Sequence, residues 1–578
     1  MRILLLTRSF NSLAQRLWLA LRAHGHELAV EYDINDAVTL EAVELFAPDL
    51  LIAPYLQRAI PETVWRRLVC LVVHPGVVGD RGPSALDWAI AEGRRDWGVT
   101  VLQATAEMDA GPVWASEPFA MREASKSSLY RRDVCDAAVC AVLRAVHHFS
   151  QHGATPPPPP PPPPLADPRG RWRPFMRQED RAIDWQRDDT ASVLRKIRAA
   201  DGAPGVLDQL FRVTCQLFDA HAEPGHVPVP HGPPGELLAR RGHAVLRATR
   251  DGAVWLGHVR RLDAPGVTGV RGAIKLPTTL AFAREAASLP EWPVAIDAQA
   301  GWREIHYERH RDVGVLHFNV YNGAMSTALC EALLHALRWA LAQPPRVLLL
   351  AGGSDVWCNG IHLNVIEAAA SPADESWRNI VAINELTREL IEASGHLVIA
   401  AMQGSAGAGG VFMALAADEV WAHPGVVLNP HYKNMGNLYG SEYWTYLLPR
   451  RLRAGATARD VMAQRLPLSA AQACGLGLLD AVFAGSAQDF MALALARAAA
   501  LAASPELPAR LAAKHAARVR DEAVKPLDAY RDDELAHMRR NFYGFDPSYH
   551  IARSNFVRRV LPSWTPRHLA VHRQTHRN

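Results

Sequence analysis

Nine consecutive prolines, Pro156 to Pro164, constrain the fold of this chain more strongly than any other feature. Proline fixes φ at about −65° and lacks a backbone N–H, so the run must form an extended polyproline helix that cannot join a sheet. Such a segment belongs between packed units, either as a spacer on the surface or as a ligand for an aromatic-lined groove on a partner. We therefore expect a first domain over residues 1–155, a linker over 156–165 and further domains after it.

The length and the charge of the chain narrow its class. At about 100–200 residues per domain, 578 residues predict three or four domains. The 62 Lys and Arg against 59 Asp and Glu leave a net charge of +3, which does not favour a nucleic-acid partner because phosphate binding needs a concentrated positive field. Seven scattered cysteines without a C-x-x-C favour neither a disulfide framework nor a structural zinc site. With no signal peptide and no apolar run of about 18 residues, we expect a cytoplasmic protein without a membrane partner.

The part before the prolines alternates short buried strands with helices. We expect strands at 3–6, 50–53 and 68–73 and a helix at 11–23. This alternation is typical of a parallel, Rossmann-like sheet, whose ligands bind at the carboxyl ends of the strands. One loop at that edge runs from Thr7 to Ser12, and another is His74-Pro75-Gly76.

Two more domains are predicted after the prolines. A helix at 190–200 and the β-like segments 243–248 and 253–259, separated by Gly and Pro turns, indicate a small β-rich domain over 166–278. The rest, 279–578, reads as an α/β domain with a helical carboxyl-terminal extension from about residue 487. Its expected strands are 313–320, 346–350 and 397–402, and its expected helices are 326–342 and 377–393.

The first candidate site combines His74 with Asp109, 35 residues later. The segments VVHPGVVGDRGPSALDWAI and GVTVLQATAEMDAGPVWA resemble the 10-formyltetrahydrofolate-dependent formyltransferases, and RAIDW (Arg181–Trp185) looks like the start of the β-barrel domain of that family. The resemblance implies a formyl transfer in which the imidazole moves protons and binds the oxyanion, while the carboxylate orients the ring and accepts a proton. The structural alternative is a strand-end histidine and a turn aspartate. Val72 stands where the family has asparagine, which leaves open another acceptor, a weaker oxyanion site or no transfer.

The second candidate site lies in the third domain. The segments VLLLAGGSDVWCNGIHL and IAAMQGSAGAGGVFMALAADEVWA resemble the enoyl-CoA hydratase/isomerase (crotonase) superfamily. The resemblance implies that the backbone N–H groups of Ile361 and Gly409 form an oxyanion hole for an acyl-CoA thioester. The two hydratase glutamates are missing, since Phe412 stands at one position and His431-Tyr432 follows the proline at the other.

Addition of water to an enoyl thioester is therefore not expected. Tyr432 and Glu442 are the candidate acid–base pair, and which of them is acid and which is base stays open. In the alternative interpretation Tyr432 is core packing and Glu442 favours a helix amino terminus.

Candidates for binding coenzyme A and folate are spread over both domains. Arg8 and Ser9 follow the first strand, Arg131 follows the SSLY segment, and Asn322 follows the first strand of the third domain, where crotonases commonly hold the CoA adenine or ribose. A plain Asn-Gly turn at Asn322 and ordinary surface arginines are the alternatives. No third ligand stands near His306 and His310 in the sequence, so no metal site is expected.

The fusion of these units, with VHPGVVGDRGPS, PGVLD and YNGAMST in order, resembles the HypX/HoxX family of hydrogenase maturation factors. The resemblance implies synthesis of carbon monoxide for the [NiFe]-hydrogenase active site. The formyl group of 10-formyltetrahydrofolate would pass to coenzyme A, and formyl-CoA would be decarbonylated. The resemblance also implies that other maturation proteins are candidate partners. Two alternatives stay open, a formyltransferase for another small acceptor with a CoA-binding module, and a non-catalytic maturation scaffold.

Overall fold

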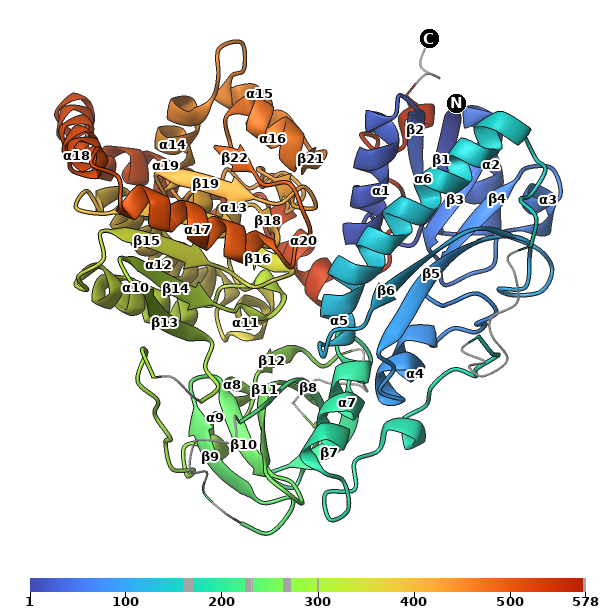
Figure 1. The fold of residues 1–578 in the computed structure, drawn as a ribbon, viewed down its shortest axis with the longest axis horizontal. Helices are drawn as coiled ribbons and strands as arrows, with labels where there is room; N and C mark the ends of the chain where they lie inside the picture. Colours follow the sequence, from blue (N-terminus) through green and yellow to red (C-terminus); the bar gives the residue numbers. More distant parts are fainter. Residues whose placement is uncertain (160–169, 224–229, 231, 264–271, 299–300, 575–578) are drawn as a thin grey trace.

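The computed structural model describes residues 1–159, 170–223, 230, 232–263, 272–298 and 301–574. These residues fold into three domains, with the first at the right, the second at the bottom and the third at the left of Figure 1. Prolines 160–164 of the predicted linker lie outside the described residues. The expected α/β multidomain class is confirmed.

The sheet of the first domain has the order β2-β1-β3-β4-β5-β6. Its strands are β1 (Arg2–Thr7), β2 (Glu27–Tyr32), β3 (Leu50–Tyr55), β4 (Cys70–His74), β5 (Asp96–Gln103) and β6 (Val113–Ala120). Strands β1 to β4 are parallel, but β5 and β6 are antiparallel to their neighbours. The prediction of a parallel sheet was thus wrong at this edge. For β5 and β6, the connection 104–112 is too short for the crossover that parallel neighbours require, whereas β5 runs antiparallel to β4 although the connection 75–95 between them is long.

Helices cover both faces of this sheet (Figure 1). Helix α1 (Ser12–Ala23) starts where the Asn11 side chain accepts the Ala14 N–H, and it packs beside α6 (Cys135–His152) on one face. Helices α2 (Asp36–Phe46) and α3 (Glu62–Trp65) cover the other face. The helical elements α4 (Ala85–Ala91), α5 (Lys126–Leu129) and the π-helical turn η1 (Tyr130–Val134) complete the domain.

The second domain is an antiparallel sheet of order β7-β8-β11-β10-β9, with β12 paired to β11. The strands are β7 (Val206–Leu210), β8 (Val213–Ala222), β9 (Leu237–Arg241), β10 (Ala244–Ala248), β11 (Ala253–Arg261) and β12 (Lys275–Pro277). Helix α7 (Thr190–Ala200) buries Val193 and Ile197 against Leu217 and Val254 of the sheet. The remaining short helices are η2 (Glu179–Arg181), α8 (Thr278–Ala281) and α9 (Ala283–Ala286).

The third domain contains two sheets. The larger one has the order β13 (Ile305–His310), β14 (Val313–Phe318), β15 (Val347–Ala351), β17 (Leu397–Met402), β19 (Glu419–Ala422) and β22 (Ala481–Val482). The smaller one has the order β16 (Val356–Cys358), β18 (Ser405–Gly407), β20 (Val427–Asn429) and β21 (Leu468–Ser469). Strands β16, β18 and β20 are parallel, so their carboxyl ends meet at one edge.

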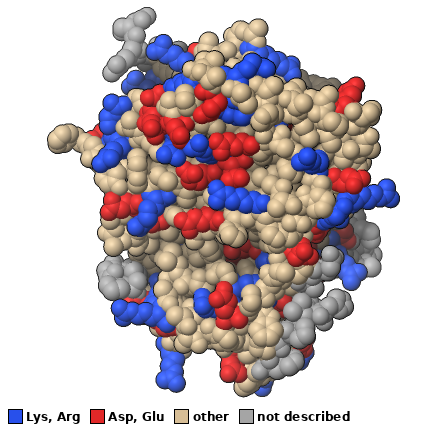
Figure 2. Space-filling view, turned by 90° about the vertical axis from the view of Figure 1, so that its left-hand side faces the viewer, with Lys and Arg blue, Asp and Glu red and all other residues tan. Residues whose placement is uncertain are grey.

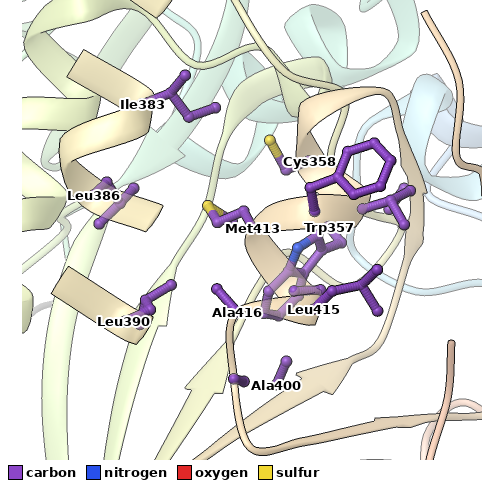
Figure 3. Close-up of a cluster of buried hydrophobic side chains, with 14 of the residues drawn as sticks. Trp357, Cys358, Ile383, Leu386, Leu390, Ala400, Met413, Leu415 and Ala416 are labelled. Carbon is purple, nitrogen blue, oxygen red and sulfur yellow. The ribbon is translucent and has the colours of Figure 1, made fainter. Parts of the chain in front are cut away.

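Helices enclose these sheets and fix that edge. The helical elements are η3 (Tyr321–Gly323), α10 (Thr327–Leu341), α11 (Leu363–Ala368), α12 (Pro372–Glu392), α13 (Gly409–Leu415), α14 (Trp444–Arg451), α15 (Ala458–Ala463) and α16 (Ala470–Leu476). Figure 3 shows Ile383, Leu386 and Leu390 of α12 pointing toward α13. This packing holds the short helix α13 against β16 and so fixes the position of its first residue.

The carboxyl-terminal segment is helical, as expected, and then returns to the first domain. Its elements are α17 (Phe490–Ala502), α18 (Leu507–Val524), α19 (Leu527–Tyr543), α20 (Ser548–Val557) and η4 (Val571–Arg573). Its last described element, η4, lies beside β2 and α2 of the first domain (Figure 1). The Val30 N–H donates to the Leu569 carbonyl. The fully buried Glu31 accepts from Thr565, from His572 Nε2 at 3.0 Å and from Arg573 Nε at 2.8 Å.

Two surface properties accompany this fold. Acidic and basic side chains are mixed over the face of the third domain in Figure 2, in agreement with the net charge of +3. Among the described residues, no single helix has the length and hydropathy needed to cross a membrane, whereas α17 and α18 pass that test only as a pair bent by 90°.

The Glu31 cluster predicts a strong effect of a single carboxylate. Burial would raise the pKa of Glu31, but the hydrogen bonds from His572, Thr565 and Arg573 hold it below its usual value, so the group is ionised at pH 7. Glu31→Ala should lower the free energy of unfolding by about 3–5 kcal/mol, because it leaves buried polar partners without an acceptor. Urea unfolding at pH 7 measures this loss, and limited proteolysis should show release of the tail after residue 560.

Glu41→Ala is the matched control. Glu41 binds only the outer side of Arg573, at 2.6 Å, and is exposed. Equal stability and equal tail cleavage in the two variants would contradict the conclusion that Glu31 holds the carboxyl-terminal tail on the first domain.

Candidate active site

In the first domain, the structure brings His74 and Asp109 together. His74 is the last residue of β4, and its Nδ1 lies 3.5 Å from Oδ2 of Asp109. Asp109 has a positive φ of 54°, and its Oδ2 accepts the Gly82 N–H at 3.1 Å. The carboxylate is therefore held in one orientation toward the ring. Val72 points to the same face of β4 as His74, because side chains alternate along a strand.

A third residue of this site, Asp80, was missed by sequence reasoning. Its Oδ2 lies 3.0 Å from His74 Nε2, and its other oxygen is bonded to Arg173. The side chains of His74, Asp80 and Arg173 are all buried. Asp80 stands in the quoted VVHPGVVGD segment, but spacing alone does not show that its carboxylate turns back to the histidine. Arg173 comes from beyond the prolines, so the ring is oriented by a segment far along the chain.

In the third domain, the residues of the second candidate site lie in the segments that follow the parallel strands of the smaller sheet. Asn359-Gly360-Ile361 follows β16, Gly409 follows β18, and Tyr432 follows β20. A Cβ added to Gly360 would lie 3.4 Å from the Gly409 nitrogen, so the two loops touch. As the first residue of α13, Gly409 has an N–H with no acceptor in its own helix. The expected pairing of the Ile361 and Gly409 amides is compatible with this geometry.

Tyr432 and Glu442 form a buried pair beside these amides. The Tyr432 hydroxyl donates to Glu442 Oε2 at 2.5 Å and lies 3.1 Å from the Ser441 carbonyl. Burial raises the pKa of Glu442 to about 7, although its hydrogen bonds from Tyr432 and Ser441 oppose that rise. Burial and the nearby Glu442 charge also raise the pKa of Tyr432. Glu442 can therefore gain or lose a proton near neutral pH, while Tyr432 keeps its phenolic proton.

The Glu442 carboxylate of this pair lies close to the backbone of Gly409 in the expected oxyanion hole. A Cβ at Gly409 would lie 2.2 Å from Glu442 Oε1, so a larger residue would displace the carboxylate. Phe412 fills the place of a hydratase carboxylate, and its ring stacks on Tyr432 with centroids 5.7 Å apart. The site thus has one carboxyl group and one phenol where a hydratase has two carboxyl groups.

The loop that carries Glu442 is strained and is held by buried partners. Glu442 and Tyr443 both have positive φ, 61° and 57°. Asn384 Oδ1 accepts the Glu442 N–H at 2.8 Å, and Glu534 accepts the Tyr443 and Thr445 N–H groups at 2.9 and 2.8 Å. Asn384 and Glu534 come from α12 and α19, and the sequence offered no signal for either.

A cavity of about 410 Å³ lies where the three domains meet. Two of the predicted binding residues line it: Arg131 in η1 and Asn322 in η3, which are bonded to each other at 2.6 Å. Arg122, Arg198, Ser127 and Ser128 line it too. Arg8 and Ser9 do not line this cavity, and the Arg8 guanidinium is bonded to the Asp33 carbonyl instead.

Short contacts connect the cavity to the second site. Asn359, which precedes the Gly360-Ile361 loop, donates from Nδ2 to the Asn322 carbonyl at 3.2 Å, and its N–H donates to Gly323 at 2.6 Å. On the other side, Asn429 beside Tyr432 donates to Gln15 of α1 at 3.1 Å. The third domain is therefore bonded to the first at both flanks of its candidate site.

The hydrogen bonds between Glu534 and the loop that carries Glu442 predict that the stability of the protein depends on pH. Burial raises the pKa of Glu534 to about 8, so the folded protein keeps a proton that the unfolded chain loses above about pH 4.5. Its contribution to stability is present at low pH and is lost as the pH rises toward 8. Relative to Glu534→Gln, which stays neutral, the unmodified protein should lose about 2–3 kcal/mol between pH 6 and pH 8.

Urea unfolding of both proteins at the two pH values measures this difference. Asp533→Asn, at the exposed neighbouring position, should retain the pH dependence of the unmodified protein. Parallel loss of stability in the unmodified protein and in Glu534→Gln would contradict the assignment.

The domains match known families in the expected order. The formyl transferase family matches residues 25–146, the formyl transferase C-terminal domain matches 176–268, and the enoyl-CoA hydratase/isomerase family matches 309–543. Methionyl-tRNA formyltransferase of Syntrophus aciditrophicus is 27% identical over 207 residues, which are 35% of this chain and 63% of that one.

Two similar proteins cover the whole chain. Hydrogenase maturation factor HoxX of Bradyrhizobium diazoefficiens is 55% identical over 573 residues, 99% of this chain and 97% of the relative. The crystal structure of HypX from Aquifex aeolicus in complex with tetrahydrofolic acid is 44% identical, covers 100% of both chains and superposes with a TM-score of 0.93. The identity, the coverage and the shared domain order show that this chain belongs to the HypX/HoxX family of hydrogenase maturation factors.

Proposed function

We propose that this protein makes carbon monoxide for the active site of [NiFe]-hydrogenase from 10-formyltetrahydrofolate, with coenzyme A as formyl acceptor. The observation that carries the proposal is the buried Tyr432–Glu442 pair beside the Gly409 amide. This pair suits proton transfer to and from a thioester, whereas addition of water would need the carboxylates that are missing. The maturation role of the Bradyrhizobium relative and the tetrahydrofolate bound by the Aquifex relative support the proposal.

In the first step, the thiol of CoA attacks the formyl carbon of the folate. A carbon–sulfur bond forms, the carbon–nitrogen bond to the folate breaks, and the thiol proton ends on the folate nitrogen. Asp109 accepts the proton from the thiol, and His74, oriented by Asp80, hydrogen-bonds the oxygen of the tetrahedral intermediate. Because a thiol is a better nucleophile than an amine, the apolar Val72 is compatible with this acceptor.

In the second step, the amides of Ile361 and Gly409 bind the oxygen of the formyl thioester. Glu442 takes the formyl hydrogen as a proton, the carbon–sulfur bond breaks, and Tyr432 protonates the sulfur. The products are carbon monoxide and the free thiol, with no net oxidation or reduction. Because Tyr432 is bonded to Glu442 at 2.5 Å, the proton on Glu442 returns to Tyr432 and restores the starting state.

The cavity at the meeting point of the domains fits the phosphates and the adenosine part of CoA. Its volume lies in the range of small-molecule sites, about 300–1,000 Å³. Arg198 provides a cation for phosphate groups, and so do Arg122 and Arg131, which are also paired with Asp133 and Asp355; Asn322 provides a polar contact. We further propose a cytoplasmic reaction, with other [NiFe]-hydrogenase maturation proteins as partners that receive the product.

Replacing one residue in each site should separate the two steps. Purified protein supplied with 10-formyltetrahydrofolate and CoA should release carbon monoxide, detected by its binding to haemoglobin. His74→Ala should lower formyl-CoA formation and carbon monoxide release together, by about 100-fold or more. Glu442→Gln should lower carbon monoxide release by a similar factor while formyl-CoA still forms, as measured by liquid chromatography.

Tyr432→Phe should behave like Glu442→Gln, and Tyr439→Phe, on the same loop and partly exposed, is its matched control. Undiminished carbon monoxide release by Tyr432→Phe and Glu442→Gln would reject the second step. Absence of carbon monoxide from the unmodified protein would reject the function as a whole.

The cavity residues make a further prediction about CoA affinity. Arg131→Ala should raise the KM for CoA about tenfold with little change in kcat, because it removes a phosphate contact and the bond to Asn322. Initial rates of formyl-CoA formation at varied CoA concentration measure both constants. Arg144→Ala, on α6 and bonded to Glu117 on the surface, is the control. An unchanged KM in Arg131→Ala would place CoA elsewhere.

A further inference from the structure

The edge hairpin of the third domain gathers histidine and carboxylate groups that the proposed reaction does not use. His306 and Glu308 alternate along β13 and so point to one face, and His317 on β14 is the registered partner of His306. The rings of His306 and His317 stack with centroids 4.4 Å apart and planes within 5°. His306 Nε2 lies 3.5 Å from Glu308 Oε1, and His317 Nε2 lies 3.6 Å from Glu308 Oε2.

The 3.5 Å between His306 Nε2 and Glu308 Oε1, and the 3.6 Å between His317 Nε2 and the other oxygen of Glu308, are each close to the separation of two ligand atoms on one metal ion. They exceed the length of a good N–H···O hydrogen bond, about 2.7–3.2 Å. Two ligand atoms at about 2.0–2.1 Å from a tetrahedral zinc ion lie about 3.3–3.4 Å apart. The three ligand atoms lie within 4.8 Å of one another, so small side-chain rotations would bring all of them into contact with one ion.

The buried nitrogen of His317 is an independent observation. Its Nε2 atom is shielded from solvent and has no hydrogen-bond partner in the described structure. A buried polar atom without a partner is costly, and an ion between the rings and the carboxylate would satisfy it. His310 Nε2 lies 3.2 Å from Oε2 of Glu308, which leaves Oε1, the oxygen nearer His306, to bind the ion; a histidine that holds the second oxygen of a ligating carboxylate orients that ligand.

We propose that His306, Glu308 and His317 bind one divalent late first-row metal ion, with zinc as the probe. Two imidazoles and one carboxylate suit this class of ion rather than calcium or magnesium, which prefer oxygen ligands. His306 and His317 also line the cavity that contains Arg131 and Asn322. The fourth coordination position therefore faces this cavity, where water or an oxygen of a bound molecule completes the shell.

Equilibrium dialysis of untagged, full-length protein against Zn²⁺, with the metal measured by mass spectrometry, tests the site. The unmodified protein should bind one Zn²⁺ per chain at micromolar or lower free concentration. His317→Gln and Glu308→Gln should each weaken this binding at least about tenfold, and His335→Gln, an exposed histidine on α10, should not. Co²⁺ in place of Zn²⁺ should give visible absorption typical of tetrahedral coordination, which the ligand variants lose.

Thermal unfolding of the metal-free variants serves as the folding control, and each should unfold like the unmodified protein. Where His317→Gln is not folded, Glu308→Gln and the absorption of Co²⁺ decide the question. Failure of the unmodified protein to bind Zn²⁺ below about 10 μM would overturn the proposal. So would equal binding by the unmodified protein and the ligand variants.

Discussion

The hydrogen bond between Tyr432 and Glu442 is the interaction on which the account of this protein depends. It joins a phenol, whose pKa burial raises, to a carboxyl group whose pKa burial raises to about 7, so the carboxyl group can gain or lose a proton near physiological pH. The Glu442 carboxylate lies against the backbone of Gly409, so that a Cβ at this position would not fit. Glu442 and Tyr443 have positive φ, and the hydrogen bonds that their N–H groups donate to Asn384 and Glu534 stabilise this backbone conformation.

The arrangement of the domains gives this pair a context. The cavity at the domain junction is lined by residues of all three domains, and the Asn359 side chain bonds its wall to the Ile361 loop. The first domain contacts the third through Gln15 and Asn429, and the tail closes on Glu31 of the first domain. The cavity wall is therefore connected by hydrogen bonds to the loop of the second candidate site.

Much of the fold could be predicted from local patterns. The helix 190–200 and the strand 397–402 have the expected boundaries, because capping residues and buried β-branched runs act locally. The antiparallel edge of the first sheet, the return of the tail to Glu31 and the packing of residue 173 against Asp80 could not be predicted. These features depend on contacts between residues far apart in the sequence, which no local pattern records.

The same distinction holds for the candidate sites. The resemblance to two families pointed to His74, Asp109, Ile361 and Gly409, and the segment after Pro430 offered Tyr432 and Glu442 as candidates. Asp80 lies six residues after His74, and Asn384 and Glu534 lie on α12 and α19; the contacts by which they orient His74 and the Glu442 loop became visible only in three dimensions. For His306 the sequence suggested no third ligand, but strand register places Glu308 and His317 beside it.

A single-turnover experiment with deuterium in the formyl group of 10-formyltetrahydrofolate tests the central claim most directly. If Glu442 removes the formyl hydrogen from a thioester, carbon monoxide release should slow by a primary isotope effect, while the transfer to CoA keeps its rate. Carbon monoxide that appears without CoA, or at the same rate from the deuterated donor when its release is rate-limiting, would contradict the account.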